Sequence, residues 1–306
     1  MRLVTRSDFD GLICGFLLRQ INLIDSWIYV HPKDLQDGLF DATPNDVLCN
    51  VPYVEGCGLW FDHHSSEFER HADEFEGSSR LAPSCARVVY DYYGGPDRFP
   101  GRSVMLDYTD RIDSGNLTKE EILNPNEWIL LGFLTDPRTG LGRFRNFTIS
   151  NYQLMDKLLG ECYDYSIAQI MAMPDINERV EVYYEQTELF HKMLEKRTKV
   201  DDHIIITDLR GEETIYTGNR FYIYSLFPEQ SISLWIVDGR QKLNVVISCG
   251  HSILNRSSLT NVGSLMLEYG GGGHFQVGTC QIPYADADRV ISEIVDRIKI
   301  DGMKTE

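Results

Sequence analysis

The first quarter of the chain alternates short apolar runs with a longer helical segment. Of all the sequence features, this alternation most restricts the folds that the chain can adopt. Apolar runs at residues 2–5, 27–30, 47–49 and 59–61 predict strands, and residues 12–24 have the apolar spacing of a helix. Strands that are separated by helices pair in parallel. The sequence therefore predicts a doubly wound α/β sheet, whose ligands would bind at the carboxyl ends of the strands.

A long helical segment then divides the chain. The further helices predicted are residues 82–93, 127–135, 151–160 and 176–199, and the further strands are residues 204–207, 221–226, 231–237 and 243–248. We therefore expect an α/β protein of two domains. An N-terminal parallel-sheet domain would cover residues 1–175, a linker helix residues 176–199, and a smaller C-terminal α/β domain residues 200–306.

The charge and the cysteines narrow the class of protein. Lys and Arg number 29 and Asp and Glu number 46, which gives a net charge of −17. A duplex-DNA binder needs the opposite surplus, and no apolar run approaches the roughly 20 residues that cross a bilayer. The seven cysteines are scattered and form no CxxC pair, which is typical of reduced thiols. We expect a cytoplasmic protein with neither duplex DNA nor a membrane as partner; the charge still allows a short anionic ligand.

Two carboxylates follow the first predicted strand. Asp8 and Asp10 stand in the segment SDFDG, residues 7–11, where a turn allows both to converge on a hard cation. An Asx-turn with a helix N-cap explains the same pattern, and for this motif alone that is the better explanation.

A carboxylate beside two imidazoles follows the fourth predicted strand. Asp62, His63 and His64 directly succeed the apolar run at residues 59–61. Oxygen and nitrogen ligands together suit manganese, zinc or iron, and a neighbouring carboxylate can orient a ligating histidine. This motif favours a metal site over a surface turn.

Four glycines and a histidine form the third motif, at residues 270–274, after a predicted helix at residues 262–269. Glycines let backbone N–H groups approach an anion closely, and His274 adds a donor. A helix-terminating loop is the alternative. Because Arg256 lies upstream, the motif favours an anion site.

In this order the three motifs resemble the DHH phosphoesterase superfamily with a C-terminal DHHA1 domain, and in particular its exopolyphosphatase-like subgroup. The resemblance covers nearly the whole chain. It implies a metal-binding DHH domain, usually with manganese, and a DHHA1 domain that grips substrate phosphate. It also implies cleavage of phosphoanhydride or phosphodiester bonds.

The resemblance assigns roles to particular residues. The metal ligands it implies are Asp8, Asp10, Asn50, His63 and Asp110, with Asp113 in reserve for Asp110. Asp62 and His64 would act in catalysis beside the metal. The phosphate-gripping residues would be Arg256, Ser257, Gly271, Gly272, Gly273 and His274.

Two positions depart from the family pattern. Arg6 stands where the family usually has a ligating His or Asp, and Asn50 stands where it has a bridging Asp. A guanidinium cannot coordinate a metal, and an amide is a poor bridge between two cations. We therefore expect one divalent ion rather than two, manganese with magnesium as the alternative. Arg6 would take part in catalysis, in a hydrogen-bonded pair with Asp8 or with a substrate phosphate, or it would simply form a salt bridge with Asp8 and close the site.

Two functions remain open from the sequence. The first is a metal-dependent phosphohydrolase that acts on polyphosphate, a short oligonucleotide or a nucleotide. The second is a non-catalytic binder of a phosphorylated small molecule or nucleotide, since a pocket that only binds tolerates lost ligands. A general single-strand nuclease is disfavoured by the charge. The loop arginines Arg138, Arg143 and Arg145 would either reach phosphate or be solvated, and a homodimer is compatible with the sequence.

Overall fold

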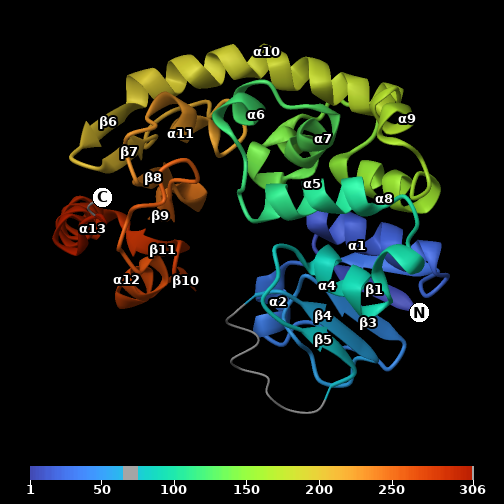
Figure 1. Ribbon diagram of the computed structural model, residues 1–306. Coiled ribbons are helices and arrows are strands. Elements are labelled where there is room, and N and C mark those ends of the chain that lie inside the picture. The colour runs from blue at the N-terminus through green and yellow to red at the C-terminus, as the bar shows by residue number, and fades with distance from the viewer. Residues whose placement is uncertain (65–74, 305–306) are drawn as a thin grey trace. The chain divides into compact units, whose positions relative to one another are not determined.

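The computed structural model describes residues 1–64 and 75–304, and the chain divides into two compact units (Figure 1). One unit comprises residues 1–116 and 124–183, and the other comprises residues 117–123 and 184–306. The division falls within the long helix α10 (Pro174–Arg197), which therefore contributes to both. The domain boundaries expected at residues 175 and 200 stay a prediction.

The described part of the first unit contains a five-stranded sheet in the order β2-β1-β3-β4-β5, and every pair is parallel. Its strands are β1 (Arg2–Thr5), β2 (Ser26–Tyr29), β3 (Asp46–Cys49), β4 (Leu59–Asp62) and β5 (Gly77–Ser79). The central strands β1 and β3 are almost fully buried, which explains why they read as continuous apolar runs. The predicted parallel α/β sheet is confirmed.

Helix α1 (Phe9–Gln20) is buried over most of its length and packs against several other helices of the unit. These are α4 (Cys85–Tyr92), α5 (Ser103–Asp113), α7 (Glu127–Thr135) and α8 (Asn151–Glu161). The other helical segments that the structure describes in this unit are α2 (Pro32–Gln36), α9 (Ile167–Met171), η1 (Gly95–Asp97), η2 (Pro137–Thr139) and η3 (Leu141–Arg143). The other face of the sheet presents Val4, Leu48 and Trp60 to Leu35 of α2. The sheet therefore has a core on each face.

The apolar pattern does not predict α5. Its buried residues are Met105, Leu106, Thr109 and Ile112, and charged residues interrupt them at Asp107, Asp110 and Arg111. This helix matters for function because it carries the acidic residues at positions 110 and 113.

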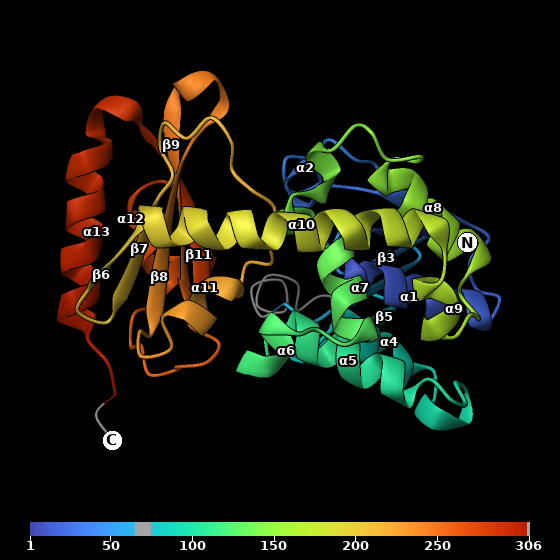
Figure 2. The same cartoon turned by 90° about the horizontal axis from the view of Figure 1, so that it is seen from above.

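The described part of the second unit contains a six-stranded sheet in the order β10-β11-β9-β8-β7-β6, in which only β7 and β8 pair in parallel. Its strands are β6 (Thr198–Asp201), β7 (Ile204–Asp208), β8 (Ile232–Asp238), β9 (Asn244–His251), β10 (Gly272–His274) and β11 (Val277–Pro283). Helices α12 (Val262–Glu268) and α13 (Ala287–Asp301) complete its main apolar core (Figure 2). The unit also contains α6 (Lys119–Leu123), η4 (Arg240–Lys242) and η5 (Tyr284–Asp286).

The strand predicted at residues 221–226 is wrong. The segment forms the short helix α11 (Tyr222–Leu226), which packs against α6. A short apolar run rich in aromatic residues does not distinguish a buried strand from a buried helical turn by its pattern. Tyr224 fixes the helical turn to the sheet, because its hydroxyl hydrogen-bonds with Ser233 Oγ at 2.8 Å.

None of the helices that the structure describes combines the length and the apolar character needed to cross a membrane.

Candidate active site

The polar residues of the first unit gather where its strands end. Asp8 follows β1, Asn50 follows β3, and Asp62 and His63 stand at the end of β4. Because these strands are parallel neighbours, their carboxyl ends meet at one edge of the sheet, where α/β proteins bind ligands.

Asp8 is enclosed by donors. Its Oδ1 accepts hydrogen bonds from Gly11 N at 3.0 Å and from Asn50 Nδ2 at 3.1 Å, and its Oδ2 lies 3.2 Å from Arg6 Nε. Gly11 permits this close turn, because a Cβ there would lie 2.4 Å from the Arg6 carbonyl oxygen. Both oxygens of Asp8 are thus engaged by the protein itself, and the positive charge beside them comes from a guanidinium.

Asn50 takes a left-handed backbone conformation, with a φ of 58°, which asparagine tolerates better than most residues. Its backbone N–H donates to Phe61 O at 3.2 Å, and its side chain donates to Asp8. The amide therefore acts here as a hydrogen-bond donor to a carboxylate.

Asp10 is held by the first turn of α4. Its Oδ2 accepts from Cys85 N at 2.9 Å and its Oδ1 accepts from Ala86 N at 2.8 Å. The N-terminus of a helix favours a nearby negative charge, so the backbone both orients and stabilises this buried carboxylate.

Asp10, His63 and Asp113 form a mixed oxygen–nitrogen cluster whose ligand atoms all lie within 4.8 Å of one another. His63 Nε2 lies 3.3 Å from Asp113 Oδ2 and 3.8 Å from Asp10 Oδ2. His63 Nδ1 lies 3.2 Å from the Ala82 carbonyl oxygen, to which it donates, so Nε2 is the atom that faces both carboxylates. Within the described residues, this buried Nε2 has no hydrogen-bond partner.

The electrostatics of this cluster favour a bound cation. Burial raises the pKa of Asp10, and the charge of Asp113 raises it further. Burial also raises the pKa of Asp113. Burial lowers the pKa of His63, but Asp113 and Asp10 outweigh it and raise that pKa to about 9. Two converging carboxylates and an imidazole nitrogen aimed at them are a donor set that fits a divalent metal ion.

Asp110 lies elsewhere on α5. Its Oδ1 accepts from Ser84 Oγ at 2.6 Å, and its Oδ2 accepts from Arg87 Nε at 2.8 Å. Ser84 caps α4, the helix whose first turn holds Asp10. Asp110 therefore secures the start of α4, whereas Asp113, one helical turn later, faces His63.

Asp62 orients His64. Its Oδ1 lies 2.8 Å from His64 Nδ1, and its Oδ2 accepts from the His64 backbone N–H at 3.3 Å. Asp62 is fully buried, while His64 is half-buried. The carboxylate thus fixes the orientation of the imidazole ring.

Sequence reasoning missed Asp136, which follows α7. Asp136 pairs with Arg138 through both carboxylate oxygens, at 2.8 and 2.9 Å. Desolvation lowers the pKa of the Arg138 guanidinium, but Asp136, Asp8 and Asp113 raise it, so Arg138 lies within electrostatic range of the cluster. The available signal was an aspartate directly after an apolar helix, in the same loop as the arginines already noted.

In the second unit, the glycine motif follows α12 and its last three residues form a strand. Gly270 ends α12 with a φ of 75°, and Gly272–His274 form β10, which pairs with β11 at the edge of the sheet. At Gly271 a Cβ would lie 2.0 Å from the Thr279 carbonyl oxygen. Close packing of β10 on β11 thus requires glycine there, independently of any ligand.

The other residues implied in phosphate binding lie in the loop after β9. Ser257 Oγ donates to Asn255 Oδ1 at 2.6 Å, and Asn255 Nδ2 donates to the Glu229 carbonyl oxygen at 2.7 Å. Arg256 is exposed, and its Nε donates to the Ile253 carbonyl oxygen at 3.3 Å. The loop is therefore held by its own hydrogen bonds and presents Arg256 at the surface.

The chain is similar to a solved structure described as the pGpG-specific phosphodiesterase PggH from Vibrio cholerae. The two share 48% sequence identity with a TM-score of 0.84, over 98% of this chain and 99% of that chain. The chain belongs to the DHH phosphoesterase superfamily. It is accordingly a hydrolase of phosphoric ester bonds, which decides against the reading as a non-catalytic binder.

More distant structures share the DHH fold. An exopolyphosphatase-related protein from Bacteroides fragilis has 15% identity and a TM-score of 0.53, over 97% of this chain and 92% of that one. RecJ from Thermus thermophilus, solved in complex with Mn²⁺, has 11% identity and a TM-score of 0.51, over 97% of this chain and 52% of RecJ. No model of a known protein family matches the sequence, and no curated protein matches it either.

Proposed function

We propose that this DHH-family protein hydrolyses a short 5′-phosphorylated dinucleotide of the pGpG type. The similarity to PggH carries the proposal, because 48% identity over nearly the full length of both chains covers both units. Hydrolysis of the single phosphodiester bond of pGpG consumes one water and releases two GMP. The net charge of −17 agrees with a substrate of this size, since only a local site has to neutralise its few phosphates.

We propose that Asp10, His63 and Asp113 hold one divalent metal ion, manganese with magnesium as the alternative. His63 Nε2 is buried, lies beside both carboxylates and has no hydrogen-bond partner among the described residues, which supports this donor set. In this proposal Asp113 takes the role that the resemblance assigned to Asp110, because Asp110 is engaged with Ser84 and Arg87. A divalent ion in such a site polarises a phosphoryl oxygen and lowers the pKa of a bound water.

The protein's own side chains then supply positive charge. Arg6 neutralises Asp8 through Nε, and a guanidinium can present its remaining N–H groups to a phosphate oxygen. His64, whose Nδ1 lies 2.8 Å from Asp62 Oδ1, donates a hydrogen bond or a proton to the same phosphate. Asp62 thus acts by positioning His64.

In the second unit we propose that Arg256, Ser257 and His274 bind substrate phosphate, together with the backbone of Gly271, Gly272 and Gly273. The exposed position of Arg256 in a hydrogen-bonded loop supports a role in binding an anion. The place of β10 as the outermost strand of the described sheet supports the same role for the glycine backbone.

The experiment is chromatographic analysis of pGpG incubated with the purified protein and Mn²⁺. We expect GMP to accumulate, chelator to stop the reaction, and an Asp10→Asn variant to produce none. Pyrophosphate, polyphosphate and longer oligonucleotides run in parallel define the substrate class. Faster release of product from any of these than from pGpG would refute the proposed substrate. Hydrolysis of pGpG that persists after exhaustive chelation would refute the proposed requirement for a metal ion.

A further inference from the structure

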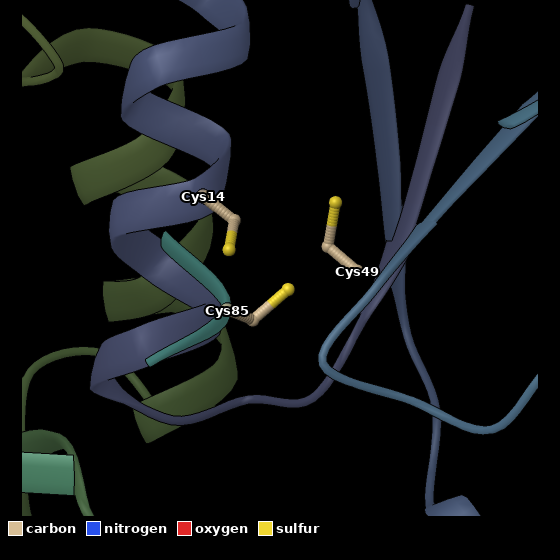
Figure 3. Close-up of side chains that lie close together, drawn as sticks. All are labelled: Cys14, Cys49 and Cys85. Atoms are coloured by element: carbon tan, nitrogen blue, oxygen red, sulfur yellow. The ribbon is translucent and has the colours of Figure 1, made fainter. Parts of the chain in front are cut away.

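Three cysteines of the first unit converge in its core (Figure 3). Cys14 lies in α1, Cys49 ends β3, and Cys85 begins α4, so the three come from distant parts of the chain. Their sulfur atoms all lie within 4.8 Å of one another, and none of the three residues has any exposed surface. Their side chains face one shared space between the sheet and the helices.

The spacing of the sulfurs fits a thiolate-bound metal. A metal–sulfur distance of about 2.3 Å separates neighbouring ligand sulfurs by about 3.8–4.0 Å. Sulfurs at most 4.8 Å apart therefore need to move by about 1 Å or less to share one cation. Side-chain rotation can supply a shift of that size without a change of fold.

The surroundings of Cys85 suit a ligating sulfur. The Asn50 backbone N–H donates to Cys85 Sγ at 3.2 Å, and hydrogen bonds of this kind stabilise metal-bound thiolates. When Cys85 is a thiol, its Sγ donates a hydrogen bond to the Phe61 carbonyl oxygen, which lies 3.1 Å away. The site thus provides a partner for either state of the sulfur.

We propose that Cys14, Cys49 and Cys85 form a second metal site, which takes a thiophilic divalent cation of the zinc class. Soft sulfur ligands select such ions, whereas the oxygen and nitrogen ligands of Asp10, His63 and Asp113 suit manganese and magnesium. Two of the thiols release their protons to solvent as metal–sulfur bonds form, and the third binds as a neutral thiol. The complex is then neutral, as a dry core requires.

The sulfur site adjoins the active site through the backbone. Cys49 directly precedes Asn50, and Cys85 N donates to Asp10 Oδ2. A cation among the sulfurs therefore lies behind the residues that enclose Asp8 and Asp10, and it stiffens the turn of α4 that holds Asp10.

Cadmium is the probe, because sulfur-to-cadmium charge-transfer absorption in the ultraviolet reports thiolate ligands alone. Cadmium that binds Asp10, His63 and Asp113 gives no such band. In the intact, reduced protein, incubated until the absorbance is constant, we expect a band that saturates at one cadmium per chain. We expect Cys14→Ala and Cys85→Ala each to weaken this binding at least about tenfold.

A matched control removes two equally buried cysteines from the other unit. Cys249 and Cys280 lie on the paired strands β9 and β11, and the double variant Cys249→Ala/Cys280→Ala should keep the band unchanged. X-ray absorption of the cadmium-loaded wild type should show sulfur atoms bound to cadmium. This measurement does not depend on whether any variant folds. Absence of the band in the wild type, or a band that Cys14→Ala leaves intact, would overturn the proposal.

Discussion

Asp8 and Asp10 stand two residues apart on one turn, yet the groups that surround their carboxylates carry opposite charges. Asp8 is neutralised from within, by Arg6 and by the Asn50 amide. Asp10 receives only backbone N–H groups and faces a second carboxylate and an imidazole, Asp113 and His63. We call Asp8 with Arg6 and Asn50 the Asp8 half of the site, and Asp10 with His63 and Asp113 the Asp10 half. The Asp8 half contains a positive charge of its own, and the Asp10 half attracts one.

This difference explains how the family's metal site can change without a loss of fold. Two buried carboxylates side by side raise each other's pKa unless positive charge offsets them. Arg6 supplies that charge permanently for Asp8, so this half is stable with no cation. The Asp10 half keeps two carboxylates and His63, a donor set that fits a cation.

We expect the largest effect from a substitution in the Asp10 half. Asp113→Asn removes one of its two carboxylates, so we expect phosphodiesterase activity to fall about a hundredfold or more, with weaker Mn²⁺ binding. Initial rates across a Mn²⁺ titration measure both effects. A variant that keeps wild-type rates at low Mn²⁺ would show that Asp113 is not a ligand.

The matched control is Asp110→Asn, one helical turn away. Because Asp110 binds Ser84 Oγ and the Arg87 guanidinium, we expect a loss of about 1–3 kcal/mol in the free energy of unfolding. Rates at saturating Mn²⁺ should change by no more than a few-fold while the protein is folded. Urea unfolding with parallel rate measurements separates the effect on stability from the effect on rate. A larger loss of rate in Asp110→Asn than in Asp113→Asn would refute the assignment of Asp113 as the metal ligand.

The sequence predicted the parallel sheet because buried central strands produce continuous apolar runs that are easy to recognise. It also predicted the neighbourhood of Asp8, Asp10, Asn50 and His63, since the carboxyl ends of parallel strands must share one edge. It favoured Asp110 and kept Asp113 in reserve, because the charged residues of α5 obscured its helical period, whereas Asp113 is the residue that lies beside His63.

Other features depend on contacts between distant segments. The three-cysteine cluster needs the folded arrangement of α1, β3 and α4, which no local pattern encodes. The Asp136–Arg138 pair is local, because the two residues stand two positions apart. The role of the glycine motif in binding an anion stays a prediction, and its glycines also allow the close packing of β10 on β11.

A smaller effect is expected from breaking the Asp8 half. Arg6→Ala leaves Asp8 with its Gly11 and Asn50 hydrogen bonds but without a neighbouring cation, so we expect a loss of about 1 kcal/mol in stability. Thermal unfolding with and without Mn²⁺ tests this, and Arg6→Lys, which keeps the charge, should recover part of the loss. Equal stability of Arg6→Ala and wild type would show that the ion pair contributes nothing.

The stoichiometry of Mn²⁺ binding tests the contrast between the two halves most directly. Calorimetric titration, checked by elemental analysis after dialysis, should give one tightly bound Mn²⁺ per wild-type chain, since the hard ion does not occupy the sulfur cluster. The double variant Arg6→His/Asn50→Asp, which restores ligands to the Asp8 half, should bind two. Two Mn²⁺ ions in the wild type, or none, would contradict the account.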